Sequence, residues 1–258
     1  MSISHRRKLN RIQMLRLLDE LEAAPGLAVS LYVPPGAPAS EIEKTLTSIP
    51  DVEDLLPDII NTCARSATGA ALFWGEHRKY LVLPPFPITD RLFSSGYTVE
   101  PLRSLLQRER TIALILIRLG SYAIGVFQGE KLLSSKVGTG HIHSRHKKGG
   151  SSQRRFERGR EKQIEYFFDR VCGHVREHLE PFIQQLDHVV YGGERHTLLS
   201  FRKQCQFLTA IDDRSAGKLL NIREPRQSTL EAAISEVWAS EVIDLNVEDM
   251  LHYRFMGL

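Results

Sequence analysis

Thr111-Ile-Ala-Leu-Ile-Leu-Ile-Arg118 is the stretch that decides the fold, because it is an almost unbroken apolar run of strand length. Two more strand-like runs follow it, Tyr122–Gln128 and Lys131–Val137, and each is joined to the one before by a short connection that contains glycine. Short connections of this kind join antiparallel neighbours. The sequence therefore predicts a three-stranded antiparallel meander.

Helical and strand-like patterns alternate after the meander. A long amphipathic helix is predicted to start near Arg155 and to end before Pro181. Its apolar positions recur at helical spacing and are Ile164, Phe168, Val171, Val175 and Leu179. Strands over 186–191 and 218–223, each followed by a helical pattern, complete this part, and such alternation favours parallel pairing. We expect a mixed-sheet α/β domain.

The residues before the meander predict an α+β arrangement. A helical stripe covers Ser4–Ala23, a strand covers Leu27–Val33, and a hairpin joins Gly69–Trp74 to Lys79–Leu83. The proline-rich exit of this hairpin leads toward a boundary near Arg108. The predicted fold class is thus α/β, with a first domain over 1–108, a second over 109–245 and a tail over 246–258.

Composition indicates a globular chain, with 42% hydrophobic and 25% charged residues. The longest strongly apolar stretch is too short to cross a bilayer and the N-terminus lacks a signal-peptide core, so we expect a cytosolic protein with no membrane partner. The three cysteines, Cys63, Cys172 and Cys205, lack C-x-x-C spacing. Buried reduced thiols are therefore favoured over a disulfide framework or a zinc site.

Positive charge is concentrated between His141 and Lys162. This segment holds eight Lys or Arg residues and two Glu residues, a net charge of +6, whereas the whole chain carries +3 and the remainder therefore −3. A local concentration of this kind favours an anionic partner.

The glycine pair Gly149-Gly150 lies within this basic segment, ahead of Ser151, Ser152 and Gln153. Glycines let backbone amides approach a ligand closely, flanking cations bind phosphate oxygens, and a helix N-terminus adds partial positive charge. Taken alone, a glycine pair and a charge run are more often a flexible connection and a solvated helix face.

The run from His146 to Arg160 resembles the central domain of eukaryotic and archaeal class 1 peptide-chain release factors, in which Gly-Gly-Gln is followed by an Arg-Phe-x-Arg helix start, here Arg155-Phe-Glu-Arg158. The resemblance extends over roughly Thr111 to Leu245 and implies an RNase H-like, mixed-sheet catalytic domain. Upstream, Ser30–Pro35 and Thr68–Leu72 resemble a reduced N-terminal domain of the same factors.

One departure is informative, because Ser151 stands where those factors have the glutamine and Gln153 comes two positions later. This arrangement resembles the Vms-type, release-factor-like proteins of ribosome quality control. The resemblance implies release of a stalled nascent chain from peptidyl-tRNA at the peptidyl transferase centre, by ester hydrolysis or by cleavage of the tRNA 3′ end.

Two absences point away from stop-codon termination. The residues between Pro35 and Ala67 contain no Asn-Ile-Lys-Ser-like decoding element, and the chain ends at Leu258 without a third domain for a GTPase. We expect no GTPase partner and no cofactor. The expected partners are the rRNA of the large ribosomal subunit and peptidyl-tRNA, while the oligomeric state and the recruiting partner are left open.

The resemblance assigns catalysis to Gly149, Gly150 and Gln153, whose amide or backbone N–H would orient water, a ribose hydroxyl or the oxyanion. Ser151 and Ser152 would cap the helix or contact RNA. The residues expected to contact rRNA or tRNA are Arg145, His146, Lys147, Lys148, Arg154, Arg155 and Arg158.

Two other functions compete with this one. The first is a non-catalytic module that binds structured RNA. The second is a metal-dependent nuclease, which needs clustered carboxylates that the meander strands lack. The His141, His143 and His146 array could ligate a metal or act as acid and base, but we favour RNA contact and expect no metal.

Overall fold

The computed structural model describes residues 5–143 and 151–246, and the chain divides into two compact units. Unit 1 comprises Met1–Arg108 with Trp238–Leu258, and unit 2 comprises Glu109–Val237. The predicted boundary after residue 108 agrees with this division. The predicted end of the second domain at 245 does not, because residues from Trp238 onward belong to unit 1.

Unit 1 is built on a six-stranded sheet in the order β1-β11-β4-β3-β2-β5, in which all neighbours pair antiparallel. Its strands are β1 (His5–Leu9), β2 (Ala28–Val33), β3 (Ala70–Gly75), β4 (Lys79–Leu83), β5 (Leu92–Ser95) and β11 (Ser240–Asp244). Its helices are α1 (Arg11–Glu22), α2 (Ala39–Leu46), the 3-10 helix η1 (Glu53–Leu55), α3 (Leu56–Arg65) and α4 (Glu100–Gln107).

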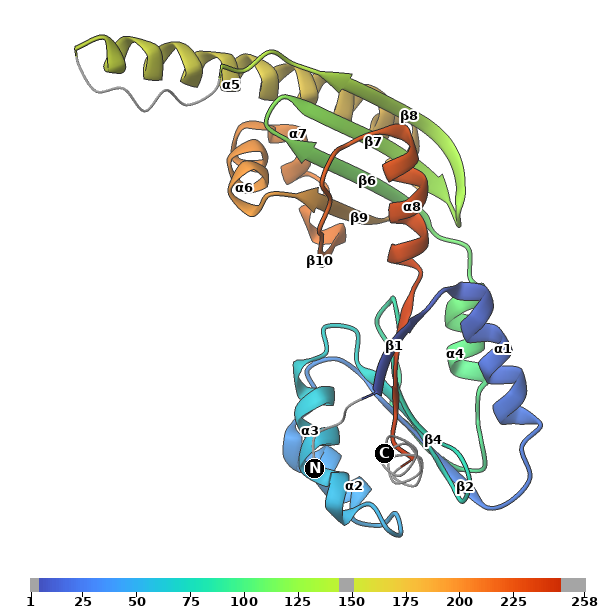
Figure 1. Cartoon of the computed structure of the whole chain (residues 1–258). Coiled ribbons are helices and arrows are strands. Elements are labelled where there is room, and N and C mark those ends of the chain that lie inside the picture. Colours follow the sequence, from blue (N-terminus) through green and yellow to red (C-terminus); the bar gives the residue numbers. More distant parts are fainter. Residues whose placement is uncertain (1–4, 144–150, 247–258) are drawn as a thin grey trace, which may run out of the picture. The chain divides into compact units, whose positions relative to one another are not determined.

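Helices cover both faces of this sheet (Figure 1). Alternate residues of β2 and β3 point to opposite sides, so Leu31 and Leu72 pack with α2 and α3, whereas Tyr32 and Phe73 pack with α1 and α4. Both faces are apolar for this reason, although the strands are antiparallel.

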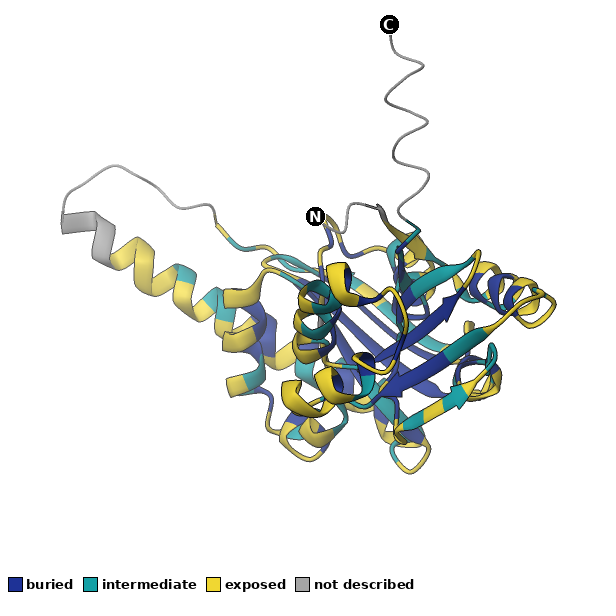
Figure 2. Cartoon of the chain, turned by 90° about the horizontal axis from the view of Figure 1, so that it is seen from below, coloured by how far each residue is buried: buried dark blue, intermediate teal, exposed yellow. Residues whose placement is uncertain are grey.

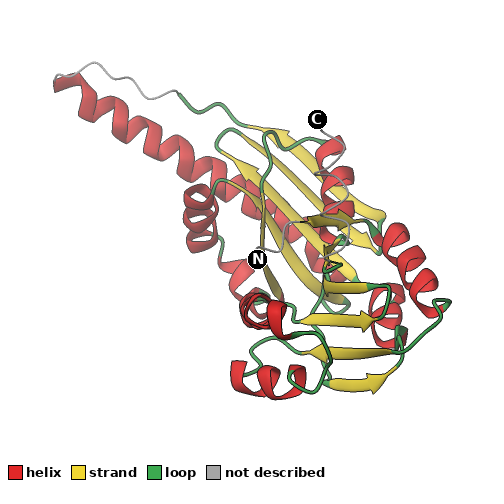
Figure 3. Ribbon diagram, turned by 60° about the horizontal axis from the view of Figure 1, so that its bottom comes forward, coloured by secondary structure: helices red, strands yellow, loops and turns green. Residues whose placement is uncertain are grey.

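Unit 2 is built on a five-stranded mixed sheet in the order β10-β9-β6-β7-β8. Figure 3 draws the strands in yellow and the helices that pack beside them in red. Strands β6, β7 and β8 form the predicted antiparallel meander, and β9 and β10 join β6 in parallel. Its strands are β6 (Thr111–Arg118), β7 (Ser121–Gln128), β8 (Lys131–Thr139), β9 (Leu186–Gly193) and β10 (Ser215–Leu220). Its helical elements are α5 (Ser151–Leu179), η2 (Glu180–Phe182), α6 (Arg195–Gln204), α7 (Gln206–Thr209), η3 (Asp212–Arg214) and α8 (Gln227–Val237).

The central strands of unit 2 are buried between helices (Figure 2). On one face, Ile115 and Val189 pack with Phe168 of α5 and Phe201 of α6. On the other face, a Cβ added at Gly125 of β7 would meet the side chain of Leu230 in α8 at 3.3 Å. Cover on both faces explains why β6 is apolar along nearly its whole length.

The first helix and strand β10 differ from the sequence prediction. The predicted helix over Ser4–Ala23 is a strand, β1, followed by a helix that begins at Arg11 after the capping residue Asn10. Strand β1 exists because β11, from the far end of the chain, supplies its only described partner. Strand β10 begins at Ser215 rather than at residue 218. The class itself, α/β with an α+β first unit and a mixed-sheet second unit, is confirmed.

The prediction for the cysteines was partly wrong. Cys172 and Cys205 form a disulfide with their Cα atoms 5.4 Å apart, and Cys63 is free and buried. The two bonded cysteines are separated by 33 positions and meet only because α5 packs beside α6, a proximity that their spacing in the sequence does not reveal. Within residues 5–143 and 151–246, no helix is both long and apolar enough to span a membrane.

Candidate nucleic-acid interface on helix α5

Helix α5 begins at Ser151, four residues before its predicted start. Gly149 and Gly150 therefore lie directly ahead of it, outside the described residues, while Ser151, Ser152 and Gln153 lie in its first turn. The role expected of Ser151 and Ser152, as a helix cap or an RNA contact, stays a prediction. Gln153 is the third described residue of α5.

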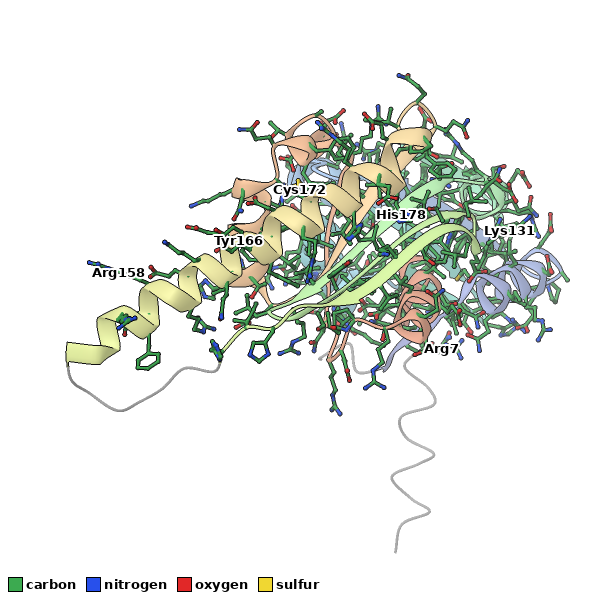
Figure 4. The ribbon with its side chains drawn as sticks, turned by 90° about the horizontal axis from the view of Figure 1, so that it is seen from above. Arg7, Lys131, Arg158, Tyr166, Cys172 and His178 are labelled. Carbon is green, nitrogen blue, oxygen red and sulfur yellow. A yellow bond between two sulfur atoms is a disulfide. The ribbon has the colours of Figure 1, made fainter. Side chains whose placement is uncertain are left out.

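The two halves of α5 differ in burial. From Phe167 onward the helix packs into the core of unit 2 through Phe167, Phe168, Val171, Val175 and Leu179. Residues 155–166 contain no buried position, and this half extends past the end of the sheet (Figure 4). We call residues 155–166, which carry the described cations of this segment, the arm. The buried half of α5 anchors the arm to the core of unit 2.

Polar contacts fix the buried half of α5 to β7 and β8. Arg170 donates to the Thr139 carbonyl at 2.7 Å, and His178 Nδ1 lies 2.7 Å from Ser134 Oγ. His174 stacks on Tyr122 with a centroid distance of 5.7 Å. Because these residues of α5 are four apart, one line of the helix is fixed against the strands. The disulfide from Cys172 ties the helix to α6 as well.

The strand-to-helix connection is attached to the arm before it enters residues 144–150. The His143 N–H donates to Gln163 Oε1 at 3.0 Å, and Arg160 Nε donates to the His143 carbonyl at 3.0 Å. Residue 143 therefore lies beside the third turn of α5. Ser151 lies about 14–18 Å farther along the helix axis from this point, at 1.5 Å per residue.

The cations expected to bind RNA fall into two groups. Arg155 and Arg158 are exposed on the arm, together with Lys162, and Arg160 is half-buried through its bond to His143. Arg145, His146, Lys147 and Lys148 lie outside the described residues, as does the side chain of Arg154. Arg155 and Arg158 are thus the predicted residues that share one described surface.

The histidine array is described only in part. The rings of His141 and His143 lie edge to face with centroids 4.8 Å apart, and both residues are exposed. His146 lies outside the described residues. Among the described residues, no group of three or more His, Cys, Asp or Glu side chains is arranged to hold a metal ion.

Two residues around the arm, Gln163 and Tyr166, were not singled out by the sequence, and the pairing of Cys172 with Cys205 was not expected. Gln163 holds the entering chain by accepting from the His143 N–H. Tyr166 is 73% exposed although it stands one position before the buried residues. An aromatic residue outside the apolar stripe of a basic helix was the available signal for Tyr166.

Archaeal release factors are similar to this chain in sequence. Peptide chain release factor subunit 1 of Aeropyrum pernix is 26% identical over 215 residues, covering 71% of this chain and 57% of the relative. That of Thermococcus sibiricus is 29% identical over 147 residues, covering 52% and 35%. The chain thus spans little more than half of the first relative's length and about a third of the second's.

Two solved structures are also similar. The archaeal translation termination factor aRF1 gives a TM-score of 0.38 at 20% identity, covering 89% of this chain and 73% of the other. The Vms1 mitochondrial localization core gives 0.37 at 11% identity, covering 73% and 80%.

The family is established by a direct match. The model of acVLRF1, described as the Actinobacteria/chloroflexi VLRF1 release factor, matches residues 110–243, more than half of the 258 residues. The chain belongs to this release factor family. The expected resemblance to release-factor-like proteins of the Vms type is thereby confirmed.

Proposed function

We propose that this protein releases stalled nascent chains from peptidyl-tRNA at the peptidyl transferase centre of the large ribosomal subunit. The observation that carries the proposal is the exposed basic arm of α5, which begins directly after Gly149-Gly150 in a chain of the release factor family. Its partners would be large-subunit rRNA and the tRNA itself, and it would work in the cytoplasm without a GTPase.

The arm would carry the site rather than perform the chemistry along its length. Arg155 and Arg158 would neutralise phosphates, a contribution that depends on salt and not on sequence. Arg145, His146, Lys147, Lys148 and Arg154 would extend this contact on both sides of the glycines. Gly149 and Gly150 would let the backbone approach the tRNA 3′ end closely.

Gln153 would act in the transition state. In hydrolysis, water attacks the ester carbonyl carbon, the bond to the tRNA 3′ oxygen breaks, and that oxygen leaves with a proton. The Gln153 amide, or its backbone N–H in the first turn of α5, would orient the water or donate to the oxyanion, worth roughly 3 kcal/mol. Cleavage of the tRNA 3′ end would use the same position, with a ribose hydroxyl as the nucleophile.

The test uses large subunits that carry a peptidyl-tRNA with one label on the peptide and one on the tRNA. Wild type and Gln153→Ala are compared in single-turnover release, and the tRNA 3′ terminus is sequenced. We expect wild type to release the peptide and the variant to slow release by about two orders of magnitude, with binding to the subunit retained. An intact terminal adenosine indicates ester hydrolysis, and a shortened tRNA indicates cleavage.

A non-catalytic RNA-binding module is the second candidate, and the exposed Arg155 and Arg158 favour it equally. It predicts salt-sensitive binding to the large subunit without release by wild type. Addition of a chelator distinguishes the remaining alternative, since a metal-dependent nuclease loses activity and the proposed mechanism does not.

A further inference from the structure

The side of α5 that points away from the sheet has an unusual composition. Arg155, Gly159, Lys162, Tyr166 and Gly173 follow one another at steps of 4, 3, 4 and 7 residues, so they form one line along the helix. All five are exposed. We call this line the outer face of α5, and it is about 27 Å long at 1.5 Å per residue.

The two glycines of the outer face have no role in the described packing. A Cβ added at Gly159 or Gly173 would meet nothing within 4 Å, and neither has a positive φ that would require glycine. Glycine is also among the least favourable residues in a helix interior. The chain therefore leaves two bare patches, each seven residues from the exposed Tyr166.

Positive and negative side chains lie on different sides of α5 along the arm. Arg155 and Lys162 lie on the outer face, and Arg158 lies one turn from each. The exposed acidic residues of the arm, Glu157, Glu161 and Glu165, are four apart and form a separate line. Asp169 lies on the outer face between Tyr166 and Gly173, where its carboxylate accepts from the Gln204 side chain. An anionic partner is therefore attracted mainly to the part of the outer face from Arg155 to Tyr166 and repelled from its flank.

We propose that the outer face of α5 packs lengthwise against an rRNA helix of the large subunit. The inference rests on the proposed function. If the N-terminal end of α5 engages the tRNA 3′ end, the rest of the helix faces the rRNA that lines the same cavity. The minor groove of A-form RNA is wide and shallow and displays 2′-hydroxyls and phosphates. Gly159 and Gly173 admit its backbone, Tyr166 Oη bonds a 2′-hydroxyl or phosphate, and Arg155 and Lys162 pair with phosphates.

Glycine replacement separates binding from stability. Gly159→Leu adds a good helix former in open space, so the melting temperature of the free protein rises by roughly 2–4 °C. The same side chain obstructs the close approach, so affinity for large subunits without tRNA falls roughly tenfold. Glu161→Leu places the same residue on the acidic line and does not weaken binding.

Two further variants identify the partner as RNA. Tyr166→Ala weakens binding to empty large subunits roughly five- to tenfold. Lys162→Ala lowers the slope of log affinity against log salt by about one. Binding of free tRNA, measured in parallel, is unchanged in Gly159→Leu and Tyr166→Ala, which separates an rRNA contact from a tRNA contact.

Unchanged affinity of Gly159→Leu and Tyr166→Ala for empty subunits would overturn the inference. So would a loss of affinity with no change of salt slope in Lys162→Ala, since that pattern indicates a ribosomal protein. A loss on free tRNA would move the contact to the tRNA. Because these measurements use subunits without peptidyl-tRNA, a wild type that binds but releases no peptide would contradict the proposed function alone.

Discussion

Gly193 closes β9 in a conformation that other residues rarely adopt. Its φ is +131°, and a Cβ at this position would lie 2.0 Å from the carbonyl oxygen of Ile117 on the neighbouring strand. We expect Gly193→Ala to lower the free energy of unfolding of unit 2 by at least about 2 kcal/mol, through strain and steric clash. Urea unfolding of the full chain measures this loss.

Gly173 provides the matched control for that substitution. Gly173→Ala makes the same chemical change in open space on a helix, and we expect it to stabilise the protein by up to about 1 kcal/mol. Equal effects of the two substitutions would mean that the close contact at Gly193 is not what requires glycine.

Cys63 links stability to alkaline pH. Burial raises the pKa of its thiol from 9.0 to about 12 in the folded protein. A raised folded-state pKa gives stability that is complete below pH 9 and is lost as the pH rises from 9 toward 12, because only the unfolded chain releases the proton. Between pH 8 and pH 10, wild type should lose roughly 1 kcal/mol more than Cys63→Ala.

Chemical denaturation at several pH values checks this difference. Tyr191, whose pKa burial raises to about 12, is present in both proteins and contributes equally to their alkaline instability. Parallel stability profiles for wild type and Cys63→Ala up to pH 10 would show that the thiol is not shielded from solvent.

At the scale of elements, the disulfide between α5 and the end of α6 makes unit 2 sensitive to reductant. Closing a loop between residues 33 positions apart stabilises a fold by about 3–4 kcal/mol in the chain-entropy description. We expect reduction to lower the melting temperature of the oxidised full chain and to increase hydrogen exchange in α5 and α6. The Cys172→Ala/Cys205→Ala variant is insensitive to reductant.

Mass spectrometry first verifies that the starting chain contains the disulfide, since the oxidised chain is lighter by two hydrogens than the reduced one. An oxidised chain whose melting and exchange do not respond to reduction would show that packing alone holds α5 against α6.

The sequence predicted best those elements whose structure depends on residues close together in the chain. The strand Thr111–Arg118 was predicted with the bounds that the structure has, because an apolar run is a property of a short segment. Strand β1 was missed because its pairing depends on β11, more than 200 residues away. Its last residue, Leu9, fits a helical stripe equally well.

The candidate site follows the same rule. The clustering of cations was evident in the sequence, and the structure brings Arg155 and Arg158 onto one exposed arm. The attachment of His143 to Arg160 and Gln163 could not be predicted, since side-chain hydrogen bonds depend on the path of the chain around them. The catalytic roles of Gly149, Gly150 and Gln153 stay predictions.

At the scale of the whole molecule, unit 1 is assembled from both ends of the described chain. Strand β11 lies between β1 and β4, and Trp238, Val242 and Ile243 are fully buried. We expect truncation after residue 237 to abolish cooperative unfolding of unit 1, because two strands lose their partner, while unit 2 keeps its protection. Hydrogen exchange resolved along the chain measures both effects.

Truncation after residue 246 is the control, since it retains β11. Full protection of β4 (Lys79–Leu83) in the shorter chain would mean that the remaining strands form a stable sheet without it.

The position of β11 also sets an order of events during synthesis of this protein. Unit 2 is one continuous stretch, so it can fold as soon as it has left the ribosome that makes it. Unit 1 begins to emerge earlier, yet its sheet has a gap between β1 and β4 until residue 244 has been added. The part of the protein that is translated first is therefore the part that is completed last, and until then its unpaired strand edges need protection from wrong pairing.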